Sequence, residues 1–178
     1  MKVLFVSDIH GSLFYANKIK DIYDKEKVDS LVVLGDLYYH GPRNDLSYEY
    51  NPMKVSEVLS SLKNNMYVIR GNCDAEVDEM ISDFHFYDSL TLEINGKKVF
   101  CSHGHKYNID NLPKQSFDVM FYGHFHIGFI KERDGLLFVN PGSISLPKGD
   151  SVNSYAVMDE TCICLKDLDG NVLGEKKF

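Results

Sequence analysis

The chain has 178 residues, enough for one sizeable core, and its 44% hydrophobic and 25% charged residues are ordinary for a globular protein. The net charge of -7 argues against a protein that grips long nucleic acid, although a metal site can still attract a small anion. The apolar run at residues 2–7 is too short for a membrane span or a signal peptide core, so we expect a cytoplasmic protein without membrane contacts.

The first half of the sequence predicts alternating strands and helices. Short apolar runs predict strands at residues 2–7, 31–34 and 66–69. A helix is predicted from the capping residue Ser12 to about residue 27, another from Pro52 to about residue 62, and a short one over 76–82. A loop rich in Gly, Pro and Asn covers residues 36–51.

The second half predicts mostly β-structure. Asn95-Gly96 and Asp134-Gly135 are strong turn signals, which predict one hairpin from residues 90–94 and 98–102 and another from 127–132 and 136–140. Further strands are predicted at 117–122, 155–158 and 162–165, with a last short strand after Asp169-Gly170. Two sheets packed face to face, with helices outside, would accommodate both halves.

Polar residues follow the carboxyl ends of five predicted strands. In chain order these motifs are Asp8-Ile9-His10, Gly35-Asp36, Gly71-Asn72-Cys73-Asp74, His103-Gly104-His105 and His124-Phe125-His126. Ligands of open α/β sheets bind beyond the carboxyl ends of the strands, so five such motifs in one domain are expected to converge. In extended backbone, residues two apart point the same way, which would turn both Asp-x-His and His-x-His pairs to one side and place Ile9 and Phe125 in the packing.

Each motif alone has an ordinary structural explanation. An isolated Asp-x-His is typical of a capped turn, Asn72 of a turn with positive φ, and His103 and His105 of surface histidines. His40 and His85 are expected to be structural or exposed. The joint occurrence of five motifs at five strand ends favours metal binding, and Asp, His and Asn ligands without thiolate suit Mn²⁺, Fe²⁺, Ni²⁺, Co²⁺ or Zn²⁺.

The four cysteines show no C-x-x-C spacing, so we expect reduced thiols, with Cys162 and Cys164 on one face of a strand.

The order of the motifs resembles that of the calcineurin-like metallophosphoesterase superfamily. Residues 40–44, 71–74, 140–143 and 147–149 are similar to small bacterial and archaeal phosphodiesterases of the YfcE type. The resemblance implies one domain over residues 1–178 with an α/β (α+β) fold, a four-layer α-β-β-α sandwich of two mixed sheets flanked by helices. It implies two divalent metal ions, with Mn²⁺ favoured. It assigns Asp8, His10 and His126 to the first ion, Asn72, His103 and His124 to the second, and Asp36 to both.

The implied activity is hydrolysis of small phosphodiesters, with Asp36, Asn72 and His103 as catalytic residues and a metal-bridging hydroxide as the nucleophile. Arg43, Asn44, Cys73 and His105 are the expected substrate-binding residues. Many superfamily members have His where this chain has Cys73, and a neutral thiol is a poor acid near pH 7. We therefore expect a preference for diesters with good leaving groups, and His105 is a second candidate for the acid.

Several alternatives stay open at the level of sequence. Arg43 could hold a substrate phosphate or fix its loop by a salt bridge, whereas Arg70 is expected to be structural. Asp74 is expected to cap the helix that follows it rather than orient a ligand histidine. A protein-binding scaffold resembling the retromer subunit Vps29 is the main rival function, but it predicts lost ligands. A homodimer is compatible with the sequence, and cyclic nucleotides, nucleotide diesters and phospholipid-derived diesters would all present the required phosphodiester.

Overall fold

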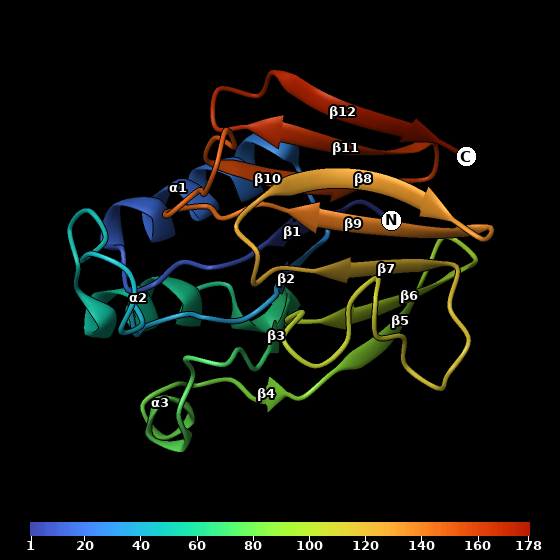
Figure 1. Ribbon diagram of the computed structural model, residues 1–178. Helices are drawn as coiled ribbons and strands as arrows, with labels where there is room; N and C mark the ends of the chain where they lie inside the picture. Colours follow the sequence, from blue (N-terminus) through green and yellow to red (C-terminus); the bar gives the residue numbers. More distant parts are fainter.

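The computed structural model describes residues 1–178 and places twelve strands in two sheets (Figure 1). The 7-stranded sheet has the order β12-β11-β10-β1-β2-β3-β4. Its strands are β1 (Val3–Val6), β2 (Ser30–Val33), β3 (Met66–Ile69), β4 (Phe86–Tyr87), β10 (Ser154–Met158), β11 (Cys162–Asp167) and β12 (Val172–Lys177). The 5-stranded sheet has the order β5-β6-β7-β9-β8. Its strands are β5 (Leu90–Ile94), β6 (Lys97–Ser102), β7 (Val119–Tyr122), β8 (Gly128–Arg133) and β9 (Leu136–Pro141).

Both sheets are mixed, and the parallel strands in each determine where the chain can build a site. Strands β1 to β4 are parallel to one another, and β10 to β12 continue the sheet antiparallel. In the second sheet β6, β7 and β9 are parallel, with β5 and β8 antiparallel at the edges. Parallel strands end at the same edge of a sheet, so each sheet presents a row of strand-end loops.

The helices lie on one side of the molecule. They are α1 (Leu13–Glu26), α2 (Pro52–Ser60) and α3 (Glu76–Met80), with the 3-10 helix η1 at Lys63–Asn65. The Ser12 side chain caps α1 by accepting the Tyr15 N–H, and Pro52 opens α2, as the sequence predicts. Helices α1 and α2 cover the outer face of the first sheet through a cluster that includes Ile19, Val55 and Leu59. No helix meets the length and hydrophobicity needed to cross a lipid bilayer.

Two further apolar clusters surround the second sheet. Between the sheets lie 16 buried residues, and at their centre the rings of Phe5 and Phe121 stack with centroids 3.7 Å apart. Removing one such ring from water contributes about 1.5–3 kcal/mol to the stability of the fold. On the outer face of the second sheet, Phe100, Phe117 and Phe138 pack with two other buried side chains. No helix follows Met80, so this outer face lies under loop backbone rather than under a helix.

The structure confirms the predicted fold class of two mixed sheets packed face to face. Both predicted hairpins are present, and their turns have positive φ at both central residues: Asn95 and Gly96 in one, Asp134 and Gly135 in the other. The sequence analysis did not predict β4 or η1, and β12 spans 6 residues rather than being a brief extension. The structure also places helices over one sheet only, whereas the prediction placed them outside both.

Candidate metal centre

The five predicted motifs meet at one edge of the two-sheet stack. Asp8 and His10 follow β1, Asp36 follows β2 and Asn72 follows β3. From the second sheet, His103 follows β6, and His124 and His126 follow β7. Since β1 to β3 are parallel, as are β6 and β7, their carboxyl ends form two facing rows of loops. The predicted convergence is therefore present.

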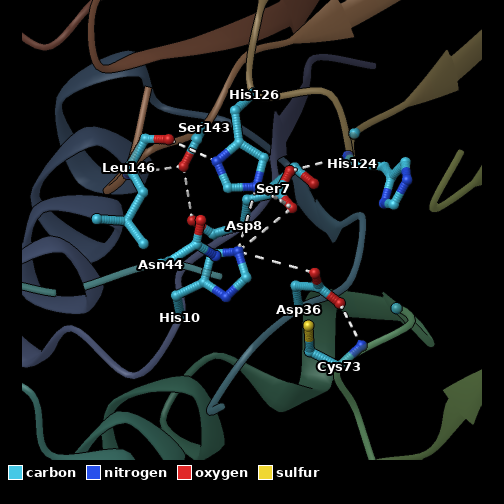
Figure 2. Close-up of polar contacts among 12 residues, drawn as sticks. Ser7, Asp8, His10, Asp36, Asn44, Cys73, His124, His126, Ser143 and Leu146 are labelled. Atoms are coloured by element: carbon cyan, nitrogen blue, oxygen red, sulfur yellow. Dashed lines mark hydrogen bonds and ion pairs between the residues drawn. The ribbon is translucent and has the colours of Figure 1, made fainter. Parts of the chain in front are cut away.

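Asp8 is the centre of a first group of side chains. Its Oδ1 lies 3.3 Å from Nε2 of His126 and 3.7 Å from Nε2 of His10, and the two imidazole nitrogens are 3.3 Å apart. All three residues are buried. Figure 2 shows both rings and the carboxylate turned toward a common space.

Asp36 joins this group to a second one. Its Oδ2 lies 3.7 Å from Nε2 of His10 and 3.4 Å from Nε2 of His103. His103 Nε2 is in turn 3.1 Å from Oδ1 of Asn72. Asp36 therefore stands between the two sets of residues, which is the position required of a carboxylate shared by two ions.

The ring orientation of three histidines is determined by backbone carbonyls. Nδ1 of His10 donates to Tyr39 O at 2.8 Å, Nδ1 of His103 donates to Leu34 O at 2.6 Å, and Nδ1 of His126 donates to Leu146 O. A carbonyl oxygen only accepts hydrogen bonds, so each Nδ1 carries a proton. In the neutral imidazole each Nε2 then has a free lone pair directed at the Asp carboxylates, which is the arrangement typical of metal-ligating histidines.

One acceptor in this buried cluster has no matching donor. Oδ1 of Asp8 is buried and has no hydrogen-bond partner, while its Oδ2 accepts the His124 N–H at 3.0 Å. Leaving a buried charged acceptor unpaired costs free energy, so buried charges are paired or coordinate metals. The ligand atoms of two triads, Asp8–His10–His126 and Asp8–Asp36–His103, lie within 4.8 Å of one another. The residues present fit divalent cations.

The pKa values in the cluster also indicate that its carboxylates are stabilised by a positive charge beside them. Burial alone would lower the pKa of His103, but the hydrogen bond to Asp36 and the charges of Asp8 and Asp36 raise it to about 9. Burial would raise the pKa of Asp8, but the neighbouring His10, His126 and His103 hold it well below its usual value. A divalent cation would satisfy the same carboxylates without requiring a protonated histidine.

His124 lies differently from the other predicted ligands. Its ring centroid is 5.2 Å from that of His103, and in Figure 2 the ring lies apart from those of His10 and His126. Its ring therefore lies on the side of the site that contains His103 and Asn72.

The backbone reasoning behind the paired motifs is wrong. Asp8 and His10 have φ of 58° and 49°, and His124 and His126 have φ of 67° and 60°, so neither pair is extended. Ile9 is buried as predicted, but Phe125 is 44% exposed. Left-handed residues turn the chain tightly, which lets consecutive ligands reach the site from a short loop.

Two glycines allow the strand-end loops to approach one another. A Cβ at Gly71 would collide with the carboxylate and backbone N of Asp36, and a Cβ at Gly123 would collide with Oγ of Ser7. Neither glycine has positive φ, so it is space rather than backbone conformation that requires glycine at both positions.

Asp74 has a role that the sequence analysis did not predict. Its carboxylate accepts three backbone hydrogen bonds, from the N–H groups of Asp36 and Leu37 at 2.8 Å each and from Gly71 at 2.7 Å. It does not cap α3: the residue at the N-cap is Ala75, whose N–H donates to Asp78. Burial and the charge of Asp36 raise the pKa of Asp74 to about 6. Asp74 fixes the loop that presents Asp36.

The segment after β9 supports Asp8 and was not assigned a role from sequence. The hydroxyls of Ser143 and Ser145 each donate to the Asp8 carbonyl at 2.8 Å. Asn140 donates from Nδ2 to the Gly123 carbonyl at 2.8 Å and accepts the Gly142 N–H at 2.9 Å. The sequence feature that could have identified these residues is the polar run after a predicted strand, which is also the feature that identified the five motifs.

A pocket of about 470 Å³ opens beside the cluster, a volume suited to a small ligand. Its rim contains the expected substrate-binding residues Arg43, Asn44 and Cys73, together with Lys148, which the sequence analysis did not single out. Of the chain's three arginines, Arg70 and Arg133 pair with carboxylates. Arg43 has no such partner, so the predicted alternative of a loop-fixing salt bridge is wrong. Asn44 donates to the His40 carbonyl at 2.6 Å, which fixes its loop.

Neither expected acid is an effective proton donor near neutral pH. Burial and the charge of Asp36 raise the pKa of Cys73 to about 12, so its thiol holds its proton tightly. Burial, with His103 and His124, lowers the pKa of His105 to about 4, so its imidazole is neutral. His105 does not line the pocket, although its ring centroid is 5.4 Å from that of His103.

The remaining histidine and arginine expectations agree with the structure. His85 is 64% exposed in its side chain and pairs with Glu79, and Arg70 pairs with Glu79 and Asp88. His40 lies in the loop before Arg43, and its ring packs edge-on against those of Tyr39 and Tyr50.

Comparisons with known proteins agree with this geometry. Residues 1–161 match the model of the calcineurin-like phosphoesterase superfamily domain. Phosphodiesterase YfcE of Escherichia coli K12 is 39% identical over 163 residues, which cover 89% of this chain and 88% of the relative. The E. coli Yfce structure, described as a phosphoesterase, superposes with a TM-score of 0.96 at 35% identity over 99% of both chains. Vacuolar Protein Sorting 29 of Cryptosporidium parvum shares the fold, with a TM-score of 0.70 at 19% identity over 99% of this chain and 97% of its own.

Proposed function

The chain belongs to the calcineurin-like phosphoesterase superfamily, and from that premise we propose that it is a metal-dependent phosphodiesterase acting on small phosphodiesters. The observation that carries the proposal is the buried acceptor cluster of Asp8, Asp36 and three histidines, in which Asp8 Oδ1 has no donor. The hydrolytic activity of the YfcE relative is consistent with it.

We assign the ligands to two cation positions. Asp8, His10 and His126 would hold one ion, Asn72, His103 and His124 the other, with Asp36 shared. The arrangement that supports this is Asp36 Oδ2 lying within 3.7 Å of both His10 and His103. Nitrogen and oxygen donors suit Mn²⁺, which we propose, and also Ni²⁺, Co²⁺, Fe²⁺ and Zn²⁺. Bound ions of this kind activate water and neutralise charge on the phosphoryl oxygens.

The protein's own side chains position the substrate. Arg43 and Lys148 are exposed cations on the pocket rim, and neither pairs with a carboxylate. Their charges attract a phosphate in a protein whose net charge is -7. The planar fork of Arg43 suits two oxygens of one phosphate, whereas Lys148 acts as a point charge. We infer that they hold the non-reacting part of an anionic diester.

Cys73 restricts the substrates that can react. It stands on the pocket rim, and its N–H donates to Asp36 Oδ1 at 2.8 Å, which places its side chain beside the reacting centre. With a pKa raised to about 12 by burial and by the charge of Asp36, the thiol is a weak proton donor for a departing alkoxide. We therefore propose that good leaving groups are preferred and monoesters are poor substrates.

The main rival is a protein-binding scaffold of the same fold. The likeness to Vacuolar Protein Sorting 29 is at 19% identity and concerns the fold alone. All seven predicted ligand positions carry metal-binding residue types, and the structure gathers them at one edge, which favours the enzyme.

The test combines metal analysis with hydrolysis of bis-p-nitrophenyl phosphate after reconstitution with Mn²⁺. Asp36→Ala is expected to lower the rate by about a hundredfold or more, because metal-ion catalysis supplies several kcal/mol and each 1.36 kcal/mol is tenfold. Asp24→Ala, an exposed carboxylate on α1, is the matched control. Equal activity and equal metal content in both variants would remove Asp36 from the proposed centre.

A further inference from the structure

A second group of potential metal ligands lies on strands β11 and β12. The Sγ atoms of Cys162 and Cys164 are 3.4 Å apart, and Cys164 Sγ donates toward Oε1 of Glu175 at 3.9 Å. All three ligand atoms lie within 4.8 Å of one another. The two cysteines are half-buried and Glu175 is exposed, so the group is accessible to ions from solvent.

Strand geometry explains why these side chains meet. Ile163 and Leu165 point into the core between the sheets, so Cys162 and Cys164 project from the opposite face of β11. Glu175 on β12 pairs directly with Cys164 across the antiparallel ladder and therefore projects from the same face.

The group is far from the candidate metal centre along the strands. Ile163 pairs with Met158, and Met158 pairs with Val3 at the beginning of β1. The centre lies beyond the other end of β1, at Asp8. Figure 1 shows the chain's two termini on the side of the molecule where these strand ends lie, away from the helices. The cysteines are therefore not ligands of the phosphoesterase centre.

We propose that Cys162, Cys164 and Glu175 form a second metal site, for a thiophilic divalent cation such as Zn²⁺. Thiolates prefer soft cations, whereas the nitrogen and oxygen donors around Asp36 do not discriminate in that way. Two sulfurs bound tetrahedrally to one zinc ion at about 2.3 Å lie about 3.8 Å apart, close to the separation seen here. Solvent can occupy the fourth position, because Glu175 is on the surface.

A disulfide is a poorer fit to the same pair. Residues two apart in a strand have Cα atoms about 6.6 Å apart, at the upper limit of the disulfide range, so closing the bond would bend β11. A cation removes the thiol protons on binding, because a coordinating thiol is deprotonated outright.

Neighbouring charges leave the site available. Lys166 is engaged by Glu26 at 2.7 Å, and Lys177 reaches the other oxygen of Glu175 only at 3.8 Å. An exposed pair of this kind contributes little, so the Glu175 carboxylate is free to turn toward an ion. Binding would link β11 to the edge strand β12.

The test is a Cd²⁺ titration of the Mn²⁺-loaded protein under reducing conditions, followed by the ultraviolet charge-transfer band of cadmium thiolates. Wild type and Cys73→Ser are both expected to show the band with one equivalent of Cd²⁺, and the Cys162→Ser, Cys164→Ser double variant is expected to lose it. Glu175→Gln should weaken binding by roughly tenfold or more, since even residues that only support ligands contribute about 10–100-fold.

Two outcomes would overturn the proposal: a wild-type protein without the band, or a band that survives in the double variant. Hydrolysis of bis-p-nitrophenyl phosphate by the double variant shows that the variant is folded. If the double variant does not fold, the single variant Cys164→Ser is used in its place. As an independent readout on the Mn²⁺-loaded protein, Zn²⁺ should raise the melting temperature of Cys73→Ser more than that of the double variant.

Discussion

The close approach of the loops after β2 and β3 offers a sharp test of how the centre is built. Gly71→Ala adds one methyl group where the Asp36 carboxylate and backbone N already lie. Gly71 does not have positive φ, so alanine introduces no backbone strain at this position. The substitution therefore perturbs the site by volume alone.

The expected magnitude follows from the contacts. The added Cβ would lie 2.9 Å from Asp36 Cγ and closer still to Oδ1, and real Cβ atoms do not approach below 3.0 Å. The Asp36 side chain, held in place by Cys73 and His103, has to retreat by roughly an ångström. Overpacking of this kind costs about 1–3 kcal/mol of stability. Misplacing a reacting group by about 1 Å costs about a hundredfold in rate.

The assay is steady-state hydrolysis of bis-p-nitrophenyl phosphate across a Mn²⁺ titration, with the free energy of unfolding measured in urea. Gly174→Ala on β12 is the control, because its new Cβ meets neighbours only at 3.9 and 4.0 Å and its φ is not positive. Both substitutions restrict the unfolded chain equally, so that contribution cancels. If Gly71→Ala binds Mn²⁺ and turns over like Gly174→Ala, the argument that this glycine positions Asp36 is wrong.

Four other predictions concern the leaving group, the metal, the rim and acid stability. Cys73→His is expected to raise the relative rates of monoesters and of diesters with poor leaving groups, because imidazolium is a better acid than the thiol; unchanged ratios over an ester panel would contradict this. Removing metal with EDTA should lower the melting temperature by about 5–10 °C, as about 2.7 kcal/mol is lost for an ion present at about 100 times its Kd; no shift would argue against resident ions. Arg43→Ala and Lys148→Ala should raise KM more than they lower kcat, and the opposite pattern in a kinetic assay would exclude a role in binding. Burial raises the pKa of Glu26, but contacts led by Lys166 lower it from 4.5 to about 2, so ionised Glu26 stabilises the fold above pH 4.5 and this contribution fades as pH falls toward 2. Glu26→Gln should therefore melt below wild type at pH 7, with the difference shrinking toward pH 2.

The fold was predictable where local signals and burial agree. Apolar runs predicted β1 and β2 because strands buried on both faces need no alternation, and β3 is an apolar run although Tyr67 is exposed. The Asn95-Gly96 and Asp134-Gly135 turns gave two hairpins because positive φ favours these residues. Strand β4 was missed since it has only 2 residues and depends on pairing with β3, which no local pattern reveals. The lack of a helix on the outer face of the second sheet likewise could not be predicted, because no helical pattern follows residue 80 and periodicity in the first half does not reveal this.

The proposed ligands of the candidate site could be predicted from the sequence, but the residues that hold those ligands in place could not. Strand-end position and residue type identified all seven proposed ligands, since parallel strands deliver their ends to one edge. Asp74 was assigned to a helix cap because Asp before a short helix is a common local pattern. Its actual partners, Asp36 and Leu37, are 38 and 37 residues away in sequence. The hydroxyls of Ser143 and Ser145 reach Asp8 across an even longer separation, so only the folded chain reveals them.

The backbone of the site shows why local reasoning failed there. Five of the nine non-glycine residues with positive φ are proposed ligands: Asp8, His10, Asp36, His124 and His126. Each such residue costs of order 1–3 kcal/mol and persists only where its surroundings hold it. Those surroundings are present: Asp74 binds the backbone of Asp36, and Ser143 and Ser145 bind that of Asp8. The supporting residues and the strained ones form one unit, because a ligand loop this tight would relax without hydrogen bonds to its backbone. The unfavourable backbone conformations therefore occur where the charged side chains cluster, as expected of a functional site.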